Sequence, residues 1–169
     1  NLMGENMTIS VVFTANSFAL QANRYSGFVS RNNGFGYNDN YNLLLNSSGF
    51  LGYRVGTGTG DDGFYDYGNT TITLNKTHSY MTSMQYNSDN NQTTVKMYLD
   101  GNFEKEYSFT GKPLVTDDPT YHTVLGRYGA DGKGLQYLDG TIHSVRIYDR
   151  VLSDEEIEYN YKIDKQRFN

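Results

Sequence analysis

Two short segments of the chain combine the residue types that proteins use to hold sugars. The first segment, residues 34–41, contains tyrosine, asparagine, aspartate and glycine. The second, residues 64–67, contains tyrosine and aspartate. Aromatic faces cover the C–H patches of a sugar ring, while amides and carboxylates hydrogen-bond its hydroxyl groups. For a glycan ligand, the predicted contacts are Tyr37, Asn38, Asp39, Tyr41, Tyr65, Asp66 and Arg127. The alternative is that such polar aromatic loops are simply common in a chain rich in tyrosine and asparagine.

Arg127 opens a third segment, residues 127–134, which we expect to form a loop before the last strand. Its guanidinium group has the geometry for a bidentate contact with a ligand carboxylate. An arginine in such a loop more often pairs with a neighbouring surface aspartate, and we favour that second interpretation.

The glycine-rich run at residues 56–63 contains Asp61 and Asp62, and Asp66 follows it. A phosphate-binding loop needs a helix directly after it, and no helical pattern follows this run. Converging carboxylates can hold calcium, which makes Asp61 and Asp62 candidate ligands. The spacing of an EF-hand is absent, so the run is better interpreted as a glycine-rich loop between strands.

Composition restricts the classes of function. The 169 residues predict one domain, which can bury about two thirds of its unfolded surface. The net charge of −5 is dispersed, which argues against a nucleic-acid partner. Membrane insertion is not expected, because no apolar run approaches the ~20 residues of a membrane span. The absence of cysteine excludes disulfides and thiol nucleophiles within the chain.

The hydrophobic pattern predicts a protein made almost entirely of β-strands. Residues 8–14 alternate between apolar and polar side chains, as a half-buried strand does. Short strands separated by turn signals are typical of a sandwich. Asp100-Gly101 predicts a two-residue hairpin turn. The break in alternation at Ile142 predicts either a β-bulge or a strand that is buried on both faces there. The other strands are expected at residues 27–31, 41–45, 50–55, 70–74, 80–86, 94–99, 103–109, 121–125 and 136–148.

A helix is expected at residues 153–165. Ser153 and Glu156 have the spacing of a capping box, in which each side chain accepts a backbone N–H at the start of the helix. Leu152 and Ile157 have the spacing of the hydrophobic staple that accompanies it.

Four motifs in order give the chain a family resemblance. Residues 7–13, 94–101, 124–127 and 140–157 resemble the opening strand, the central hairpin and the strand-then-helix ending of laminin-G-like, concanavalin A-like lectin/glucanase domains of bacterial surface and phage proteins. The resemblance implies an all-β fold, an antiparallel β-sandwich jelly roll with a short C-terminal helix. It further implies one domain over residues 1–169, which we expect to be a fragment of a larger protein.

The resemblance leaves calcium as an open expectation. Some members of the family hold a structural calcium through aspartates of an extra opening strand and an aspartate pair in the closing strand. This sequence starts after that strand, and His143 and Ser144 stand where the pair would be.

A catalytic role is not expected. Glucanases of related fold place acidic residues in an E-x-D-x-x-E pattern on one strand, and this pattern is absent. Glu104 and Glu106 share a strand face, but they lie beside the hairpin turn, where a solvated surface is expected. No G-x-S-x-G elbow occurs, and the three histidines are far apart in the sequence.

The sequence therefore predicts a non-catalytic, lectin-like carbohydrate-binding module, which could be appended to an enzyme. Its expected location is extracellular, on a cell surface or on a virion. Its expected partners are a glycan or another ligand on a host or cell surface, and the other domains of its parent protein. The alternative is a structural or protein-interaction module of an adhesin or tail fibre without a sugar site. Convergence of aromatic and polar side chains in one place distinguishes the two.

Overall fold

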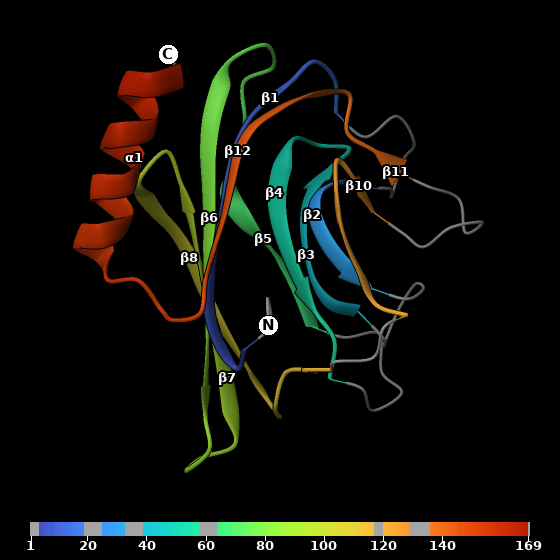
Figure 1. Ribbon diagram of the computed structural model, residues 1–169, viewed down its shortest axis with the longest axis vertical. Coiled ribbons are helices and arrows are strands. Elements are labelled where there is room, and N and C mark those ends of the chain that lie inside the picture. The colour runs from blue at the N-terminus through green and yellow to red at the C-terminus, as the bar shows by residue number, and fades with distance from the viewer. Residues whose placement is uncertain are drawn as a thin grey trace.

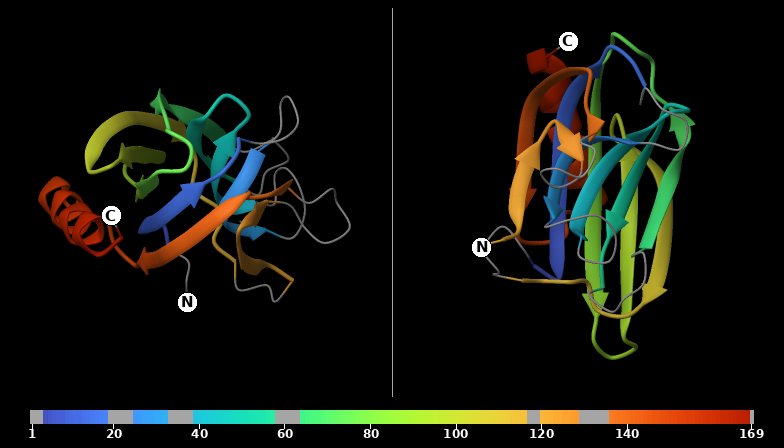
Figure 2. Two further views of the ribbon diagram at one scale, coloured as in Figure 1. Left: turned by 90° about the horizontal axis from the view of Figure 1, so that it is seen from above. Right: turned by 90° about the vertical axis from the view of Figure 1, so that its right-hand side faces the viewer.

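The structure, a computed structural model, describes residues 4–18, 25–32, 39–57, 64–116, 120–128 and 136–168. Two antiparallel five-stranded sheets pack face to face, and a helix lies outside one of them (Figures 1 and 2). This is the predicted β-sandwich jelly roll with a C-terminal helix. No helix in the described ranges is long and apolar enough to cross a membrane.

Sheet A has the strand order β12-β1-β6-β7-β8. Its strands are β1 (Asn6–Ala15), β6 (Thr77–Asn87), β7 (Gln92–Leu99), β8 (Asn102–Thr110) and β12 (Gly140–Tyr148). Sheet B has the order β5-β4-β3-β2-β9. Its strands are β2 (Tyr25–Asn32), β3 (Asp39–Asn46), β4 (Phe50–Val55), β5 (Phe64–Thr71) and β9 (His122–Leu125). Two short strands, β10 (Arg127–Tyr128) and β11 (Gln136–Tyr137), pair with each other.

The predicted turn and bulge are confirmed. Asp100 and Gly101 have φ values of 51° and 76°, as a two-residue hairpin between β7 and β8 requires. In the ladder between β1 and β12, Val12 pairs with Ser144 and Phe13 with Ile142, so His143 is the extra residue of a bulge.

Two expectations about strands were wrong. The segment at residues 64–67 is not a loop, because β5 runs from Phe64 to Thr71 rather than over residues 70–74. The expected strand at residues 136–148 is divided into β11 and β12. Of these two, β12 is an edge strand of sheet A, and its Val145 and Ile147 are only partly buried.

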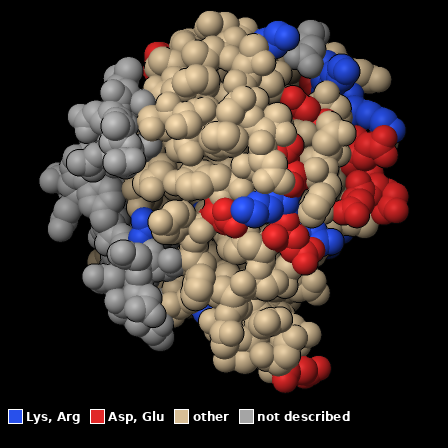
Figure 3. Space-filling model, turned by 180° about the vertical axis from the view of Figure 1, so that it is seen from behind, with Lys and Arg blue, Asp and Glu red and all other residues tan. Residues whose placement is uncertain are grey.

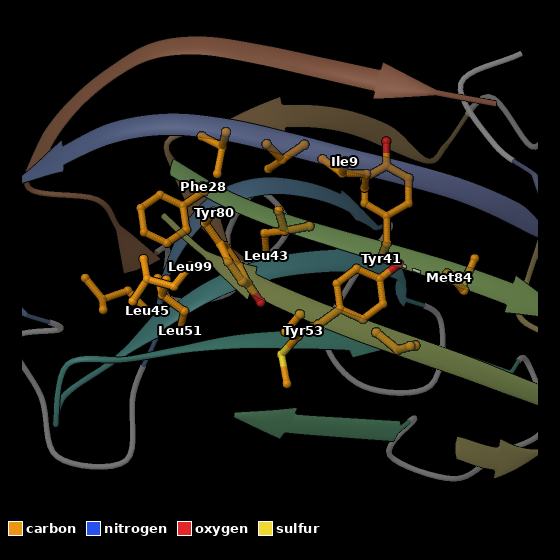
Figure 4. Close-up of a cluster of buried hydrophobic side chains, with 14 of the residues drawn as sticks. Ile9, Phe28, Tyr41, Leu43, Leu45, Leu51, Tyr53, Tyr80, Met84 and Leu99 are labelled. Atoms are coloured by element: carbon orange, nitrogen blue, oxygen red, sulfur yellow. Dashed lines mark hydrogen bonds between the residues drawn. The ribbon is translucent and has the colours of Figure 1, made fainter. Parts of the chain in front are cut away.

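The core lies between the sheets and is filled by alternate residues of each strand (Figure 4). Ile9, Val11 and Phe13 of β1 have no exposed surface, as their alternation predicts. Sheet B contributes Leu43, Leu45, Tyr41 and Tyr53, and Tyr80 of sheet A packs among them. Each buried apolar side chain of this size stabilises the fold by about 1.5–3 kcal/mol.

The helix α1 (Asp154–Phe168) lies on the outer face of sheet A (Figure 2) and ends three residues beyond the expected position. The capping box is confirmed, since Ser153 N donates to Glu156 Oε2 at 2.9 Å and Glu156 N donates to Ser153 Oγ at 3.3 Å. Leu152 and Ile157 pack in one buried cluster with Met81 and Tyr98, as the staple predicts.

A bidentate ion pair adds to this attachment. Asp164 is 1% exposed, and Arg146 of β12 donates to both of its oxygens, with Nη1 2.9 Å from Oδ2. Tyr98 Oη also donates to Asp154 Oδ1 at 2.7 Å. Polar contacts near both ends of α1 therefore join the helix to sheet A.

A buried histidine makes the stability of the fold depend on pH. His78 Nδ1 lies 2.8 Å from Asp100 Oδ2, and its Nε2 lies 3.1 Å from the Thr73 carbonyl oxygen. Burial and Lys76 oppose protonation of the ring. The hydrogen bond and charge of Asp100, with the Thr73 carbonyl, outweigh them and raise the pKa of His78 above its usual 6.5.

The expected result is that wild type loses stability relative to His78→Gln as the pH rises. A pKa raised in the folded state stabilises the fold fully below about pH 6.5, and the benefit disappears as the pH passes the folded-state pKa. Urea unfolding of both proteins between pH 5 and 9 measures the difference. A difference that stays constant over this range contradicts the assignment.

Candidate functional site

The outer face of sheet B, turned away from sheet A, carries an arginine between tyrosines. Leu51, Tyr53 and Val55 of β4 point into the core, so Arg54 between them points outward. Arg54 pairs with Tyr65 in the ladder to the edge strand β5. Because side chains alternate along a strand, Tyr67 lies on the same face as Tyr65.

The tyrosine rings form a continuous layer on this face. Tyr67 lies over Gly52, where a Cβ atom would come within 2.7 Å of its ring, so the glycine makes room for it. Tyr25 of β2 stacks on Tyr67 with ring centroids 6.2 Å apart, and Tyr65 meets Tyr67 edge to face at 6.1 Å. Tyr128 of β10 meets Tyr25 edge to face, also at 6.1 Å. We call Tyr25, Arg54, Tyr65, Tyr67 and Tyr128 the tyrosine–arginine cluster.

Arg54 is the charged member of the tyrosine–arginine cluster. Arg54 Nη1 donates a hydrogen bond to Tyr128 Oη at 3.0 Å, which holds the cationic group among the rings. Burial, followed by the hydrogen bond and the proximity of Tyr25, raises the pKa of Tyr67 above its usual 10. A tyrosine hydroxyl group is already neutral at physiological pH, and this shift moves its ionisation further away, so it brings no negative charge beside Arg54.

The surface of the cluster is shallow. The hollow, whose lining includes Arg54, Tyr65, Asp66 and Tyr67, has a volume of about 10 Å³, close to the space of one water molecule. Tyr65 is 55% exposed and presents its ring to solvent. A ligand would therefore lie on the rings, as a sugar does when its C–H face covers an aromatic side chain.

The predicted site residues are only partly brought together. Tyr65 belongs to the cluster. Arg127 is next to Tyr128 on β10 but is not one of the residues of the cluster. Asp66 is next to Tyr65 but faces the other way, because its Oδ2 lies 2.7 Å from Lys105 Nζ of β8 and its Oδ1 accepts the N–H of Tyr67. Its carboxylate is therefore occupied in joining the edges of the two sheets.

Tyr41 was wrong as a ligand contact, because it is fully buried in the core. It shares its side of β3 with Leu43 and Leu45, and burial raises the pKa of its hydroxyl group. Asp39 starts β3, but its side chain lies outside the described part of the structure. The predictions for Tyr37, Asn38, Asp61 and Asp62 also fall outside the described residues.

Sequence reasoning missed Tyr25, Arg54, Tyr67 and Tyr128. A usable signal for Arg54 was present, because a charged residue between Tyr53 and Val55 in an apolar strand must point away from the core. No comparable signal places Tyr128, because its position depends on how β10 crosses sheet B.

His143 stands where related domains would carry one of the paired aspartates, and it contacts side chains of β1 and α1. His143 Nε2 lies 2.9 Å from Thr14 Oγ1, and its ring stacks on Phe168. Within the described ranges, no group of three or more acidic, histidine or cysteine side chains could hold a metal ion.

Acidic and basic side chains are interspersed on the face shown in Figure 3 and gather toward the side that carries α1.

Comparison with known protein families identifies the superfamily of the chain. The family model described as the concanavalin A-like lectin/glucanases superfamily matches residues 1–158. The chain belongs to this superfamily. No curated protein matches the chain.

Solved structures share this concanavalin A-like fold at low sequence identity. The CBM40 of the Ruminococcus gnavus IT-sialidase, bound to α2,3-sialyllactose, is 18% identical, with a TM-score of 0.72 over 95% of this chain and 84% of that one. A leech intramolecular trans-sialidase is 18% identical with a TM-score of 0.66, and the match covers 91% of this chain but 23% of the enzyme. A pentraxin from Limulus polyphemus is 11% identical with a TM-score of 0.55, covering 91% and 68%.

Proposed function

We propose that the chain is a non-catalytic, lectin-like carbohydrate-binding module that holds glycans bearing an acidic sugar. The observation that carries the proposal is the position of Arg54 within the layer of tyrosine rings on the outer face of sheet B. The rings offer apolar surfaces for a sugar, and the guanidinium group offers the paired donors that match a carboxylate.

The surroundings of the cluster favour an acidic over a neutral sugar. The nearest carboxylate on β5, that of Asp66, is neutralised by Lys105 at 2.7 Å. Tyr67, like any tyrosine whose pKa is at or above 10, is uncharged at physiological pH. An acidic sugar would therefore meet one cation and no uncompensated anion among these groups, which favours its binding.

The similarity to the R. gnavus module supports the same ligand class, because that module was solved with sialyllactose bound. The match to 23% of the leech enzyme supports a role as one module of a larger protein. We propose that this larger protein is extracellular. Its partners would then be sialylated glycans on a host or cell surface and the other domains of its parent.

Isothermal titration of the chain with α2,3-sialyllactose and with lactose tests the proposal. Sialyllactose is expected to bind at least about tenfold more tightly, because lactose lacks the carboxylate that Arg54 recognises. The titrations are run with calcium and again with EDTA, since Asp61 and Asp62 remain candidate calcium ligands. Equal affinities would contradict the acidic-sugar proposal, and no binding of either sugar under both conditions would contradict the carbohydrate-binding role.

A further inference from the structure

The short strand β10 crosses directly over β2, and the crossing requires Gly27. A Cβ atom on Gly27 would lie 2.5 Å from the Tyr128 nitrogen and closer still to the Arg127 carbonyl group. Real Cβ atoms do not approach other atoms this closely, so any other residue would displace β10. The glycine therefore allows the backbone of β10 to rest on the face that carries Arg54.

Local irregularities in β2 and β9 hold the crossing in place. The ladder between β2 and β3 shifts register between Gly27 and Val29. Phe28, at this bulge, accepts a hydrogen bond from Gly126 N at 2.9 Å. Gly126 has a φ of +73°, which favours glycine and turns the chain from β9 into β10. Leu138 N, just after β11, donates to the Gly126 carbonyl at 2.9 Å.

Because β10 crosses β2, the side chain of Tyr128 lies in the cluster in a fixed position. Tyr128 is 2% exposed, and its hydroxyl oxygen accepts the hydrogen bond from Arg54 Nη1. The edge of its ring also packs against Tyr25. A nearly buried side chain on a braced strand has little freedom, so its hydroxyl group restricts the orientation of the guanidinium group.

We infer that Tyr128 is a positioning residue for Arg54 and sets the preference of the site for acidic over neutral sugars. The inference rests on the proposed function, in which Arg54 binds the ligand carboxylate. A preorganised guanidinium group loses less conformational freedom on binding, which raises affinity for the ligand that uses it. A ligand that only stacks on the tyrosine rings gains little from this restriction.

The test compares Tyr128→Phe with wild type for two ligands, α2,3-sialyllactose and its methyl ester. Phenylalanine fills the same space, so only the hydroxyl group is lost. Affinity for the acid is expected to fall about tenfold and affinity for the ester to change little. Tyr137→Phe, at a 62% exposed tyrosine on the neighbouring β11, is the matched control and should change neither affinity.

The outcomes separate the inference from the proposed function. Failure of wild type to bind sialyllactose would overturn both. Wild-type binding with an unchanged acid-to-ester ratio in Tyr128→Phe would overturn the inference alone, as would an equal loss for both ligands. A ligand-free measurement adds a second criterion, because NMR of the Arg54 side chain should show faster guanidinium rotation in Tyr128→Phe. An unchanged rotation rate would also overturn the inference.

Discussion

Replacing Arg54 by alanine is expected to lower the affinity for α2,3-sialyllactose by at least about a hundredfold, because two charge-assisted hydrogen bonds to the carboxylate would be lost. Arg54 lies on the outer face of β4, so its removal leaves the core residues on either side in place. Affinity for lactose should change far less, since lactose makes no such contact. Isothermal titration of both sugars measures the effect.

Two further variants show whether the loss of affinity in Arg54→Ala comes from a direct contact or from the charge alone. Arg54→Lys keeps the charge but not the planar pair of donors, so it should recover only part of the affinity. Arg167→Ala removes the same charge from an exposed position on α1 and should leave binding unchanged. Similar losses in Arg54→Ala and Arg167→Ala would indicate long-range attraction rather than a contact at the cluster.

Replacing Arg146 by alanine is expected to destabilise the fold by about 3–5 kcal/mol, because it leaves the Asp164 carboxylate buried without its partner. The carboxylate is 1% exposed, so water cannot take the place of the guanidinium group. For a chain of this size, the midpoint of thermal unfolding should fall by about 10 °C. Urea and thermal unfolding measure the two quantities.

Replacing Arg146 and replacing Asp164 should destabilise the fold by different amounts. Arg146 is 27% exposed, so in Asp164→Asn its guanidinium group can still reach water, and the loss should be smaller. The double variant Arg146→Met with Asp164→Leu removes both charges and should recover most of the stability. A loss in Asp164→Asn that equals or exceeds the loss in Arg146→Ala would contradict the account of burial.

The parts of the fold that the sequence predicted well are those determined by neighbouring residues. The capping box at Ser153 and the turn at Asp100 each depend on a few adjacent residues with strong conformational preferences. The bulge at His143 was visible because Ile142 breaks a regular alternation. The edge position of β12 was not visible, because the order of strands in a sheet depends on pairings between distant segments.

The site was predicted less well for the same reason. Tyr65 was identified from its residue type, but the segment around it was taken for a loop although Tyr65 and Tyr67 alternate as a strand does. Tyr41 was chosen by residue type, although it shares its side of β3 with Leu43 and Leu45. The contact between Arg54 and Tyr128 joins residues 74 positions apart, and local patterns do not reveal such a contact.

The most direct test of the central claim is to map the ligand on the protein by NMR. Titration of the isotope-labelled chain with α2,3-sialyllactose should shift the signals of Tyr25, Arg54, Tyr65 and Tyr67 on the outer face of sheet B. The signals of α1, on the outer face of the opposite sheet, should remain unchanged. Shifts confined to α1, or no shifts at a saturating concentration of the sugar, would contradict a glycan site at the tyrosine–arginine cluster.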